Sequence, residues 1–159
     1  MTLNMVTDRT SADVERWRTL QQKGYAAMTA DEKAEWISGT MKGAYNASDM
    51  NRVGVALNYL RDALADEEFM PRDAFTAKTD WKESDIPTVN DLTRYLSYVE
   101  SVRSATIHFA ETPRTPVNTR ALNYRDANDI EKILLSSERI LHNMCAAWFF
   151  LDDLYCGEV

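Results

Sequence analysis

The sequence predicts an all-α protein. We expect one domain over residues 1–159, a helical bundle of three long amphipathic helices, one or two short N-terminal helices and long connections. Helix-capping motifs recur along the chain, and the apolar residues behind them follow three- and four-residue steps. Strand-like alternation of apolar and polar residues is absent over any useful length. Only five Gly and four Pro leave little material for a many-turned all-β protein.

Each predicted helix opens with a side-chain acceptor followed three residues later by a carboxylate. The acceptor can take a hydrogen bond from a free backbone N–H of the first turn. The carboxylate can accept from the cap residue's N–H and also meets the positive end of the helix dipole. Behind most of these motifs comes an apolar residue, then a cation that we expect to face away from it. The pairs are Thr10 with Asp13, Thr29 with Glu32, Asn46 with Asp49, Thr88 with Asp91 and Asp126 with Asp129.

Apolar spacing behind these caps gives the expected elements. The short helices are predicted at 13–22 and 30–36, and the long ones at 47–66, 89–109 and 127–150. The connections between the long helices are longer than those of an idealised bundle, so we expect them to pack across the ends of the bundle. Residues 1–9 are expected to be flexible or arm-like.

Composition excludes several classes of protein. A formal charge of −7 argues against binding to a phosphate backbone, which relies on clustered cations. No apolar run approaches the roughly 20 residues that cross a bilayer, and the N-terminus carries no signal-peptide pattern. We therefore expect neither nucleic-acid nor membrane partners. The two cysteines, Cys145 and Cys156, are interpreted as free thiols in a reducing compartment.

The sequence indicates no catalytic or metal site and no cofactor. The two histidines, His108 and His142, are too few for a helical metal centre without carboxylates, and the Glu-x-x-His pair of di-iron bundles does not occur. Ser136 and Ser137 have no histidine in the local repeat to act as a base. A glycine-rich phosphate loop is missing as well. We expect a protein that is not an enzyme.

The C-terminal region carries more apolar surface than one helix face can bury. Two explanations stay open: Trp17, Trp36 or the connections cover this end, or it forms an interface with another chain. The interface candidates are Trp148, Phe149, Phe150, Leu151, Leu154 and Tyr155.

Several segments, in order along nearly the whole chain, carry a resemblance. They are 8–16, 28–36, 41–53, 78–81, 85–88, 122–124, 127–131, 143–149 and 155–158. In these segments the chain resembles small virion-associated proteins of phages and prophages of Gram-positive gut bacteria. Relatives have Ser at the position of Cys156, which implies no essential role for that thiol. The resemblance brings no catalytic residues with it.

What the resemblance implies is a structural or accessory protein encoded among tail, baseplate and fibre components. We expect it to be made in the host cytoplasm without a signal peptide and to reside in the virion. Its partners would be other virion proteins and further copies of itself as a homo-oligomer. The alternative is a phage regulatory or anti-defence protein that binds a basic host surface, which the charge of −7 favours.

Overall fold

The computed structural model describes residues 2–117 and 122–152, without the side chains of 148–152. Every regular element in this part of the chain is helical, and the predicted all-α bundle is confirmed. The helices are α1 (Ser11–Lys23), the short 3-10 helix η1 (Tyr25–Ala27), α2 (Ala30–Ile37), α3 (Ala47–Asp66), α4 (Val89–Ser104) and α5 (Tyr124–Asp152).

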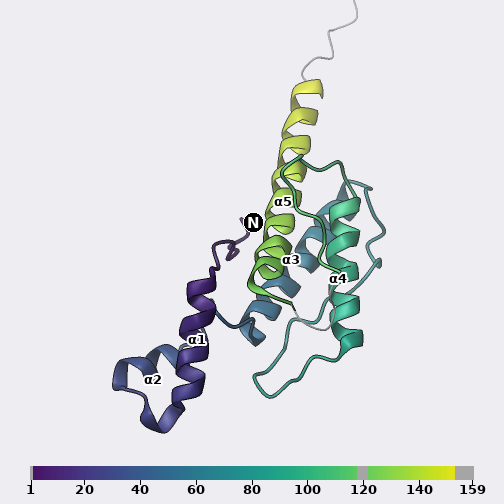
Figure 1. Ribbon diagram of the computed structural model, residues 1–159. Coiled ribbons are helices and arrows are strands. Elements are labelled where there is room, and N and C mark those ends of the chain that lie inside the picture. Colours follow the sequence, from purple (N-terminus) through teal and green to yellow (C-terminus); the bar gives the residue numbers. More distant parts are fainter. Residues whose placement is uncertain (1, 118–121, 153–159) are drawn as a thin grey trace, which may run out of the picture.

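Three long helices, α3, α4 and α5, pack against one another and enclose the main core (Figure 1). Leu57 and Leu60 of α3, Val99 of α4, and Ile130 and Ile133 of α5 are all fully buried, at 0% exposure. Burying one such side chain contributes about 1.5–3 kcal/mol. The three- and four-residue spacing of these positions places them on the inner face of each helix.

The α1–α2 pair stands to one side of this bundle (Figure 1). Its own contacts are the stacked rings of Trp17 and Trp36, whose centroids lie 6.4 Å apart, and the buried side chains of Leu20 and Met28. The chain returns beside α1 at Gly43, where an added Cβ would lie 2.0 Å from the carbonyl oxygen of Asp13. Only glycine permits this approach.

Helices α1 to α4 each begin with a reciprocal capping box, at Thr10, Thr29, Asn46 and Thr88. The predicted α5 cap at Asp126 is wrong. Asn123 caps this helix instead, because its Oδ1 accepts from the N–H groups of Arg125 and Asp126, at 2.8 and 3.2 Å. The Asp126 carboxylate accepts from the Asn123 N–H at 2.9 Å. Asn123 and Asp126 thus form a box three residues earlier, and Asp129 lies inside the helix.

Helix α4 ends five residues before the predicted boundary at 109. The chain beyond Ser104 turns back, and Arg103 Nε donates to the carbonyl oxygen of Pro113 at 2.8 Å. Ile107 is left 79% exposed. The ring of Phe109 lies instead beneath the Arg139 guanidinium, 3.9 Å from Cζ to the ring centroid.

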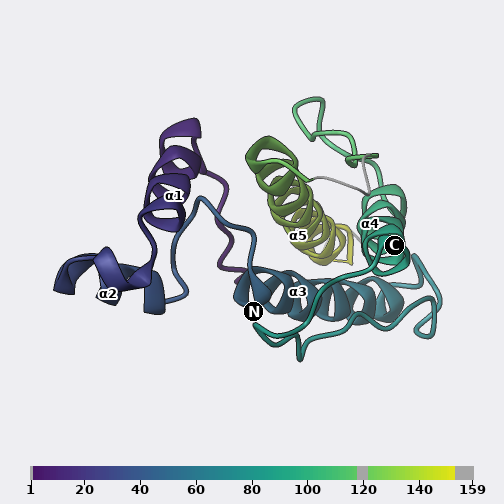
Figure 2. The same cartoon turned by 60° about the horizontal axis from the view of Figure 1, so that its bottom comes forward.

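The connection 67–88 packs along the side of α3, not across an end of the bundle as predicted (Figure 2). Asn58 pairs with both backbone groups of Ala77, at 2.8 and 2.9 Å. Asn51, two turns earlier, does the same with Trp81 at 2.6 and 2.8 Å. Gly54 lies between the two asparagines, and an added Cβ there would come 2.3 Å from the carbonyl oxygen of Lys78.

Residues 2–9 form an extended arm along α5. The N–H of Leu3 donates to both carboxylate oxygens of Glu138, at 3.0 and 3.2 Å. The backbone N–H and C=O of Arg9 pair with the side-chain amide of Asn128, at 3.0 and 2.9 Å. Leu3 and Arg9 are buried, so the arm is held at both ends.

Candidate functional site

Helix α5 continues beyond the body of the bundle. Its backbone is helical to Asp152. Among its described side chains, which end at Ala147, Leu141 is the last buried one, Met144 and Cys145 are half-buried, and Ala146 and Ala147 are exposed. Figure 1 shows this end of the helix extending past α3 and α4. The cover of α5 by the bundle therefore decreases towards Ala147, where its described side chains end.

The predicted interface residues lie in or after this stretch. Leu154 and Tyr155 lie outside the described residues. For Trp148, Phe149, Phe150 and Leu151 the helical backbone is described and the side chains are not. Their role in an interface stays a prediction.

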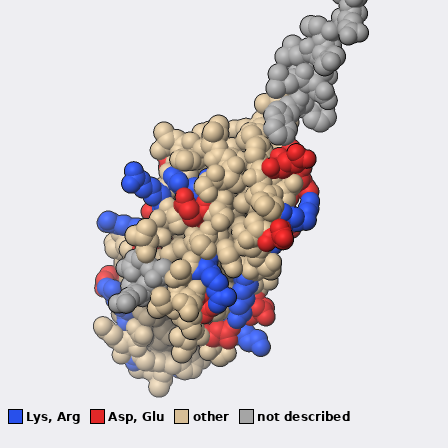
Figure 3. Space-filling view, turned by 90° about the vertical axis from the view of Figure 1, so that its right-hand side faces the viewer, with Lys and Arg blue, Asp and Glu red and all other residues tan. Residues whose placement is uncertain are grey.

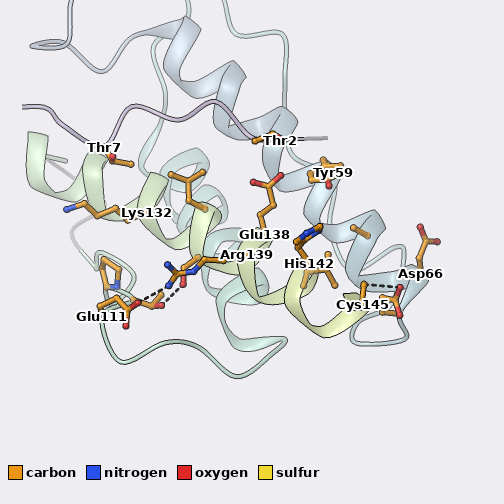
Figure 4. Close-up of a pocket in the computed structure, with 17 residues that line it drawn as sticks. Thr2, Thr7, Tyr59, Asp66, Glu111, Lys132, Glu138, Arg139, His142 and Cys145 are labelled. Atoms are coloured by element: carbon orange, nitrogen blue, oxygen red, sulfur yellow. Dashed lines mark hydrogen bonds and ion pairs between the residues drawn. The ribbon is translucent and has the colours of Figure 1, made fainter. Parts of the chain in front are cut away.

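A groove of about 810 Å³ runs over the outer face of α5 (Figure 4). Its walls are the N-terminal arm, the last turns of α3 and the segment 111–113. Floor residues recur every three or four positions, as they must on one helix face. They are Lys132, Leu135, Ser136, Arg139, His142 and Cys145.

Most charged groups in the groove are already engaged. Glu111 pairs with Arg139 at 2.8 Å (Figure 4), and the pKa of Glu111 is lowered by its backbone hydrogen bond and by that guanidinium. Glu138 accepts from the arm, as described above. Lys132 differs, because its ammonium group has no salt bridge to any residue of the described ranges. Burial raises the pKa of the nearby Asp129, and the positive charge of Lys132 lowers it in part.

The nucleophilic side chains in the groove are not activated. Burial, and then the carboxylate of Glu67 at 3.5 Å from Sγ, raise the pKa of Cys145, which keeps the thiol protonated at neutral pH. The Ser136 hydroxyl lies 2.5 Å from that of Thr112 and hydrogen-bonds with it. Within 2–117 and 122–152, no three His, Cys, Asp or Glu side chains gather closely enough to hold a metal ion.

A cluster of buried charges joins the arm, α3 and α5. The Arg9 guanidinium contacts Asp49 at 2.9 Å and Glu131 at 2.7 Å. Arg52 contacts the same two carboxylates, at 2.5 and 2.7 Å. Glu131 is fully buried and also accepts from the Val6 N–H at 2.5 Å. Buried charges need this degree of pairing, since an unpaired one is costly.

Sequence reasoning missed this cluster and expected Arg52 to face away from the core. Its side chain turns toward Glu131, because a fully buried carboxylate attracts every cation within reach. A signal was present at Glu131, which lies one turn before Leu134 and one turn after Ala127, both buried on the same helix face. A carboxylate on the apolar face of a helix indicates that a cation is buried beside it and pairs with it.

Two tyrosines lie against the charge cluster. The hydroxyl groups of Tyr45 and Tyr95 hydrogen-bond with each other, and Arg9 Cζ lies 5.4 Å from the ring centroid of Tyr45. Burial raises the pKa of both phenols, so both stay neutral over the physiological range. The pair is a structural contact between the 38–46 connection and α4.

A second hollow, of about 380 Å³, lies between the α1–α2 pair and the bundle. Trp17 and Trp36 line one side and Trp81 the other. Trp81 is covered by the Lys78 ammonium, 4.1 Å from its ring centroid. The predicted cover of the C-terminal region by Trp17 or Trp36 does not involve the described part of α5, because both rings line this separate hollow.

Comparisons with protein-family models, curated proteins and solved structures gave no match. None of the described helices combines the length and the apolar character that crossing a bilayer requires.

Proposed function

We propose that this protein is a non-enzymatic structural adaptor of a phage or phage-derived particle, associated with the tail or baseplate. The helical bundle acts as the rigid body and the C-terminal end of α5 is the part that docks on a neighbouring subunit. The resemblance to virion-associated proteins, which extends over nearly the whole chain, supports the assignment to a particle.

One observation carries the adaptor mechanism: the backbone of α5 runs on past α3 and α4 to Asp152, and Ala146 and Ala147 on this part of the helix are exposed (Figure 1). A helix segment in a protein gains most of its stability from packing against other elements. The sequence of that stretch is also strongly apolar from Trp148 to Leu151. A helix end of this composition is suited to burial against a second protein surface.

Quantitative mass spectrometry of purified particles tests the proposal. A virion component co-purifies in a fixed ratio to known tail proteins and resists washing at high salt. Host-cell lysate taken before particle assembly serves as the control. If the protein is abundant in the lysate and missing from the particles, the proposal is wrong.

The second candidate is a phage regulatory or anti-defence protein that binds a basic host surface, favoured by the net charge of −7. Such a protein needs its carboxylates gathered on one face. On the face in Figure 3, acidic and basic side chains are interspersed among uncharged ones. For this face of the molecule, that distribution supports the structural adaptor over a protein that binds a basic host surface.

A further inference from the structure

Three of the four tryptophans of the chain line one hollow, the one of about 380 Å³ between the α1–α2 pair and the bundle. Trp17 comes from α1, Trp36 from α2 and Trp81 from the connection 67–88, so three segments that are distant in the sequence each bring an indole ring to it. The volume lies within the range of about 300–1,000 Å³ that is usual for small-molecule sites. The hollow therefore has the size and the aromatic lining of such a site.

The contacts that the three rings make within the chain leave ring surface on the hollow. Trp17 and Trp36 stack on each other at an interplanar angle of 13°, and both still line it. Lys78 covers the ring of Trp81 but does not line the hollow, so it contacts that ring from outside. All three side chains are half-buried. A flat ring surface that water can reach suits a ligand that has an apolar face of its own.

The charges at the hollow balance. Its lining includes one cation, Lys82, and two carboxylates, Glu83 and Asp85. Asp85 is already neutralised, because it accepts from the Lys78 ammonium at 3.0 Å and from the backbone N–H of Lys82 at 3.1 Å. One positive and one negative charge remain. A ligand with a net charge would gain little from this balance, which favours a neutral one.

Polar groups at the hollow are available to a ligand with hydroxyl groups. The side chains of Lys82 and Glu83 are exposed, and neither forms a salt bridge with a residue that the structure describes. An indole N–H is a donor only. Among the described residues, no acceptor takes a hydrogen bond from the indole of Trp17, Trp36 or Trp81. Donors, an acceptor and flat apolar rings thus meet in one place.

We infer that this hollow binds a neutral saccharide. A sugar ring has an apolar face of C–H groups, which packs on an indole ring, and a rim of hydroxyls, which both donate and accept. Glu83 accepts from these hydroxyls, whereas Lys82 and the indole N–H groups donate to them. The inference goes beyond the proposed function and does not rest on it, because the α1–α2 pair that forms one wall lies away from the C-terminal end of α5 (Figure 1).

Local contacts hold the walls of the hollow in place before a ligand arrives. At the base of the α1–α2 pair, Asp8 and Lys42 form a salt bridge at 2.6 Å, and Gly43 packs directly against α1. On the opposite wall, the side-chain amide of Asn51 pairs with both backbone groups of Trp81. A preformed site loses less conformational entropy on binding. The anchor of Trp81 is its backbone, so its ring can be removed without loss of these two hydrogen bonds.

Titration of the full chain with neutral sugars tests the inference. The probes are maltotriose, cellotriose, mannotriose, galactobiose and tri-N-acetylchitotriose, which differ in ring stereochemistry and linkage. We expect at least one of them to shift the tryptophan emission saturably, with a dissociation constant of about 0.1–5 mM, and calorimetry to give the same constant. Choline, a cation that aromatic cages bind, and a decameric proline peptide, which docks on aromatic-lined grooves, are the competing probes.

Two variants locate the site. Trp81→Ala should raise the dissociation constant of the sugar about tenfold or more. Phe109→Ala is its matched control, because Phe109 is also a half-buried aromatic covered by a cation, Arg139 at 3.9 Å, but does not line the hollow. Glu83→Ala should raise the constant about fivefold or more. Its control is Asp80→Ala, an exposed acid of the same connection outside the lining. Both controls should stay within about twofold of the parent.

Each outcome decides the inference. Saturable sugar binding that Trp81→Ala and Glu83→Ala weaken, and that the two controls leave unchanged, supports it. No binding of any of the five sugars at concentrations up to about 10 mM overturns it. Choline or the proline peptide binding more tightly than every sugar overturns it as well, as does equal weakening by a variant and its control. If circular dichroism shows that Trp81→Ala unfolds, Glu83→Ala and its control decide.

Discussion

The carboxylate of Asp49 takes part in two different interactions. Its Oδ2 accepts from the N–H of the cap residue Asn46 at 3.1 Å, which completes the capping box of α3. Its Oδ1 accepts from Arg9 and Arg52. A local motif of α3 therefore also holds the N-terminal arm in place, and through Arg52 it reaches Glu131 on α5.

Glu131→Gln should destabilise the fold strongly. The variant keeps the shape of the side chain but removes the negative charge that balances two guanidinium groups, and breaking a buried pair typically costs about 3–5 kcal/mol. Urea unfolding followed by circular dichroism measures the loss. Glu35→Gln, which breaks the solvent-exposed pair with Arg16, is the control and should change the midpoint far less. Equal midpoints for the two variants would contradict the importance of the buried cluster.

Two capping carboxylates should make stability fall in acid. Hydrogen bonds first from the threonine hydroxyl and then from the threonine N–H lower the pKa of Asp13, through Thr10, and of Asp91, through Thr88, below 3.8. A carboxyl with a lowered folded pKa stabilises above its unfolded pKa, and the contribution is lost as pH falls through the folded value.

The double variant Asp13→Asn/Asp91→Asn isolates this effect. The parent should unfold at a higher denaturant concentration than the variant near pH 7, and the two curves should converge at about pH 2–3, where the carboxyls are protonated. Denaturant titrations across this pH range measure the difference. A difference that is constant with pH would show that the two carboxylates do not stabilise the helices through their charge.

At the scale of elements, local signals predicted most helix boundaries. The predicted 47–66 coincides with α3, because a strong cap begins this helix and its apolar stripe continues without interruption to Leu64. The errors at α4 and α5 come from competition between local signals. The apolar spacing of α4 extends to Phe109, but that ring packs under Arg139 from another element. In α5, the pair Asn123 and Asp126 forms the cap in place of the predicted pair Asp126 and Asp129.

Contacts between distant segments left no comparable local signal. Asn51 and Asn58 look like ordinary polar residues of a helix, and their pairing with Trp81 and Ala77 appears only once the connection folds back. The groove is similar. Its floor repeats at helical spacing and can be anticipated, but its walls come from the arm and from 111–113, far away in the sequence.

The helix caps should each matter individually. Replacing Asn46 or Thr88 with Ala removes the acceptor for the N–H of Asp49 or Asp91 and should cost about 0.5–2 kcal/mol. The loss should be larger for Asn46, whose Nδ2 also donates to the carbonyl oxygen of Gly39 at 2.9 Å. Thermal melts of both variants measure this. Melts that overlay the parent would mean that the caps do not stabilise these helices.

Gly54→Ala should destabilise the protein, against the usual preference of a helix interior. Alanine normally stabilises a helix by about 0.5–1 kcal/mol relative to glycine. Here the added Cβ would lie 2.3 Å from the Lys78 carbonyl oxygen, so the connection 67–88 must move away from α3. Overpacking of this kind costs about 1–3 kcal/mol. Chemical unfolding gives the sign directly, and a more stable variant would contradict the close approach.

At the scale of the whole molecule, the charge cluster and the groove depend on the same arm. Arg9 fixes one end of residues 2–9 in the cluster, and Leu3 fixes the other end against Glu138. Thr2 and Thr7 of this arm line the groove. A variant that breaks the cluster should therefore loosen one wall of the groove as well as lower stability. Binding at the groove and the free energy of unfolding are coupled through these residues.

The last prediction concerns the C-terminal region as a contact surface. Successive helical residues turn by about 100°, so an apolar run from Trp148 to Leu151 spans more than one helix face. Aromatic residues in interfaces carry a disproportionate share of the binding energy. Deleting residues 154–159, or changing Phe150 to Ser, should therefore reduce self-association or particle incorporation more than it reduces helicity. Sedimentation velocity beside circular dichroism measures both. Variants that unfold, together with a parent that is always monomeric, would show that this region only stabilises the fold and would remove the main physical support for an adaptor.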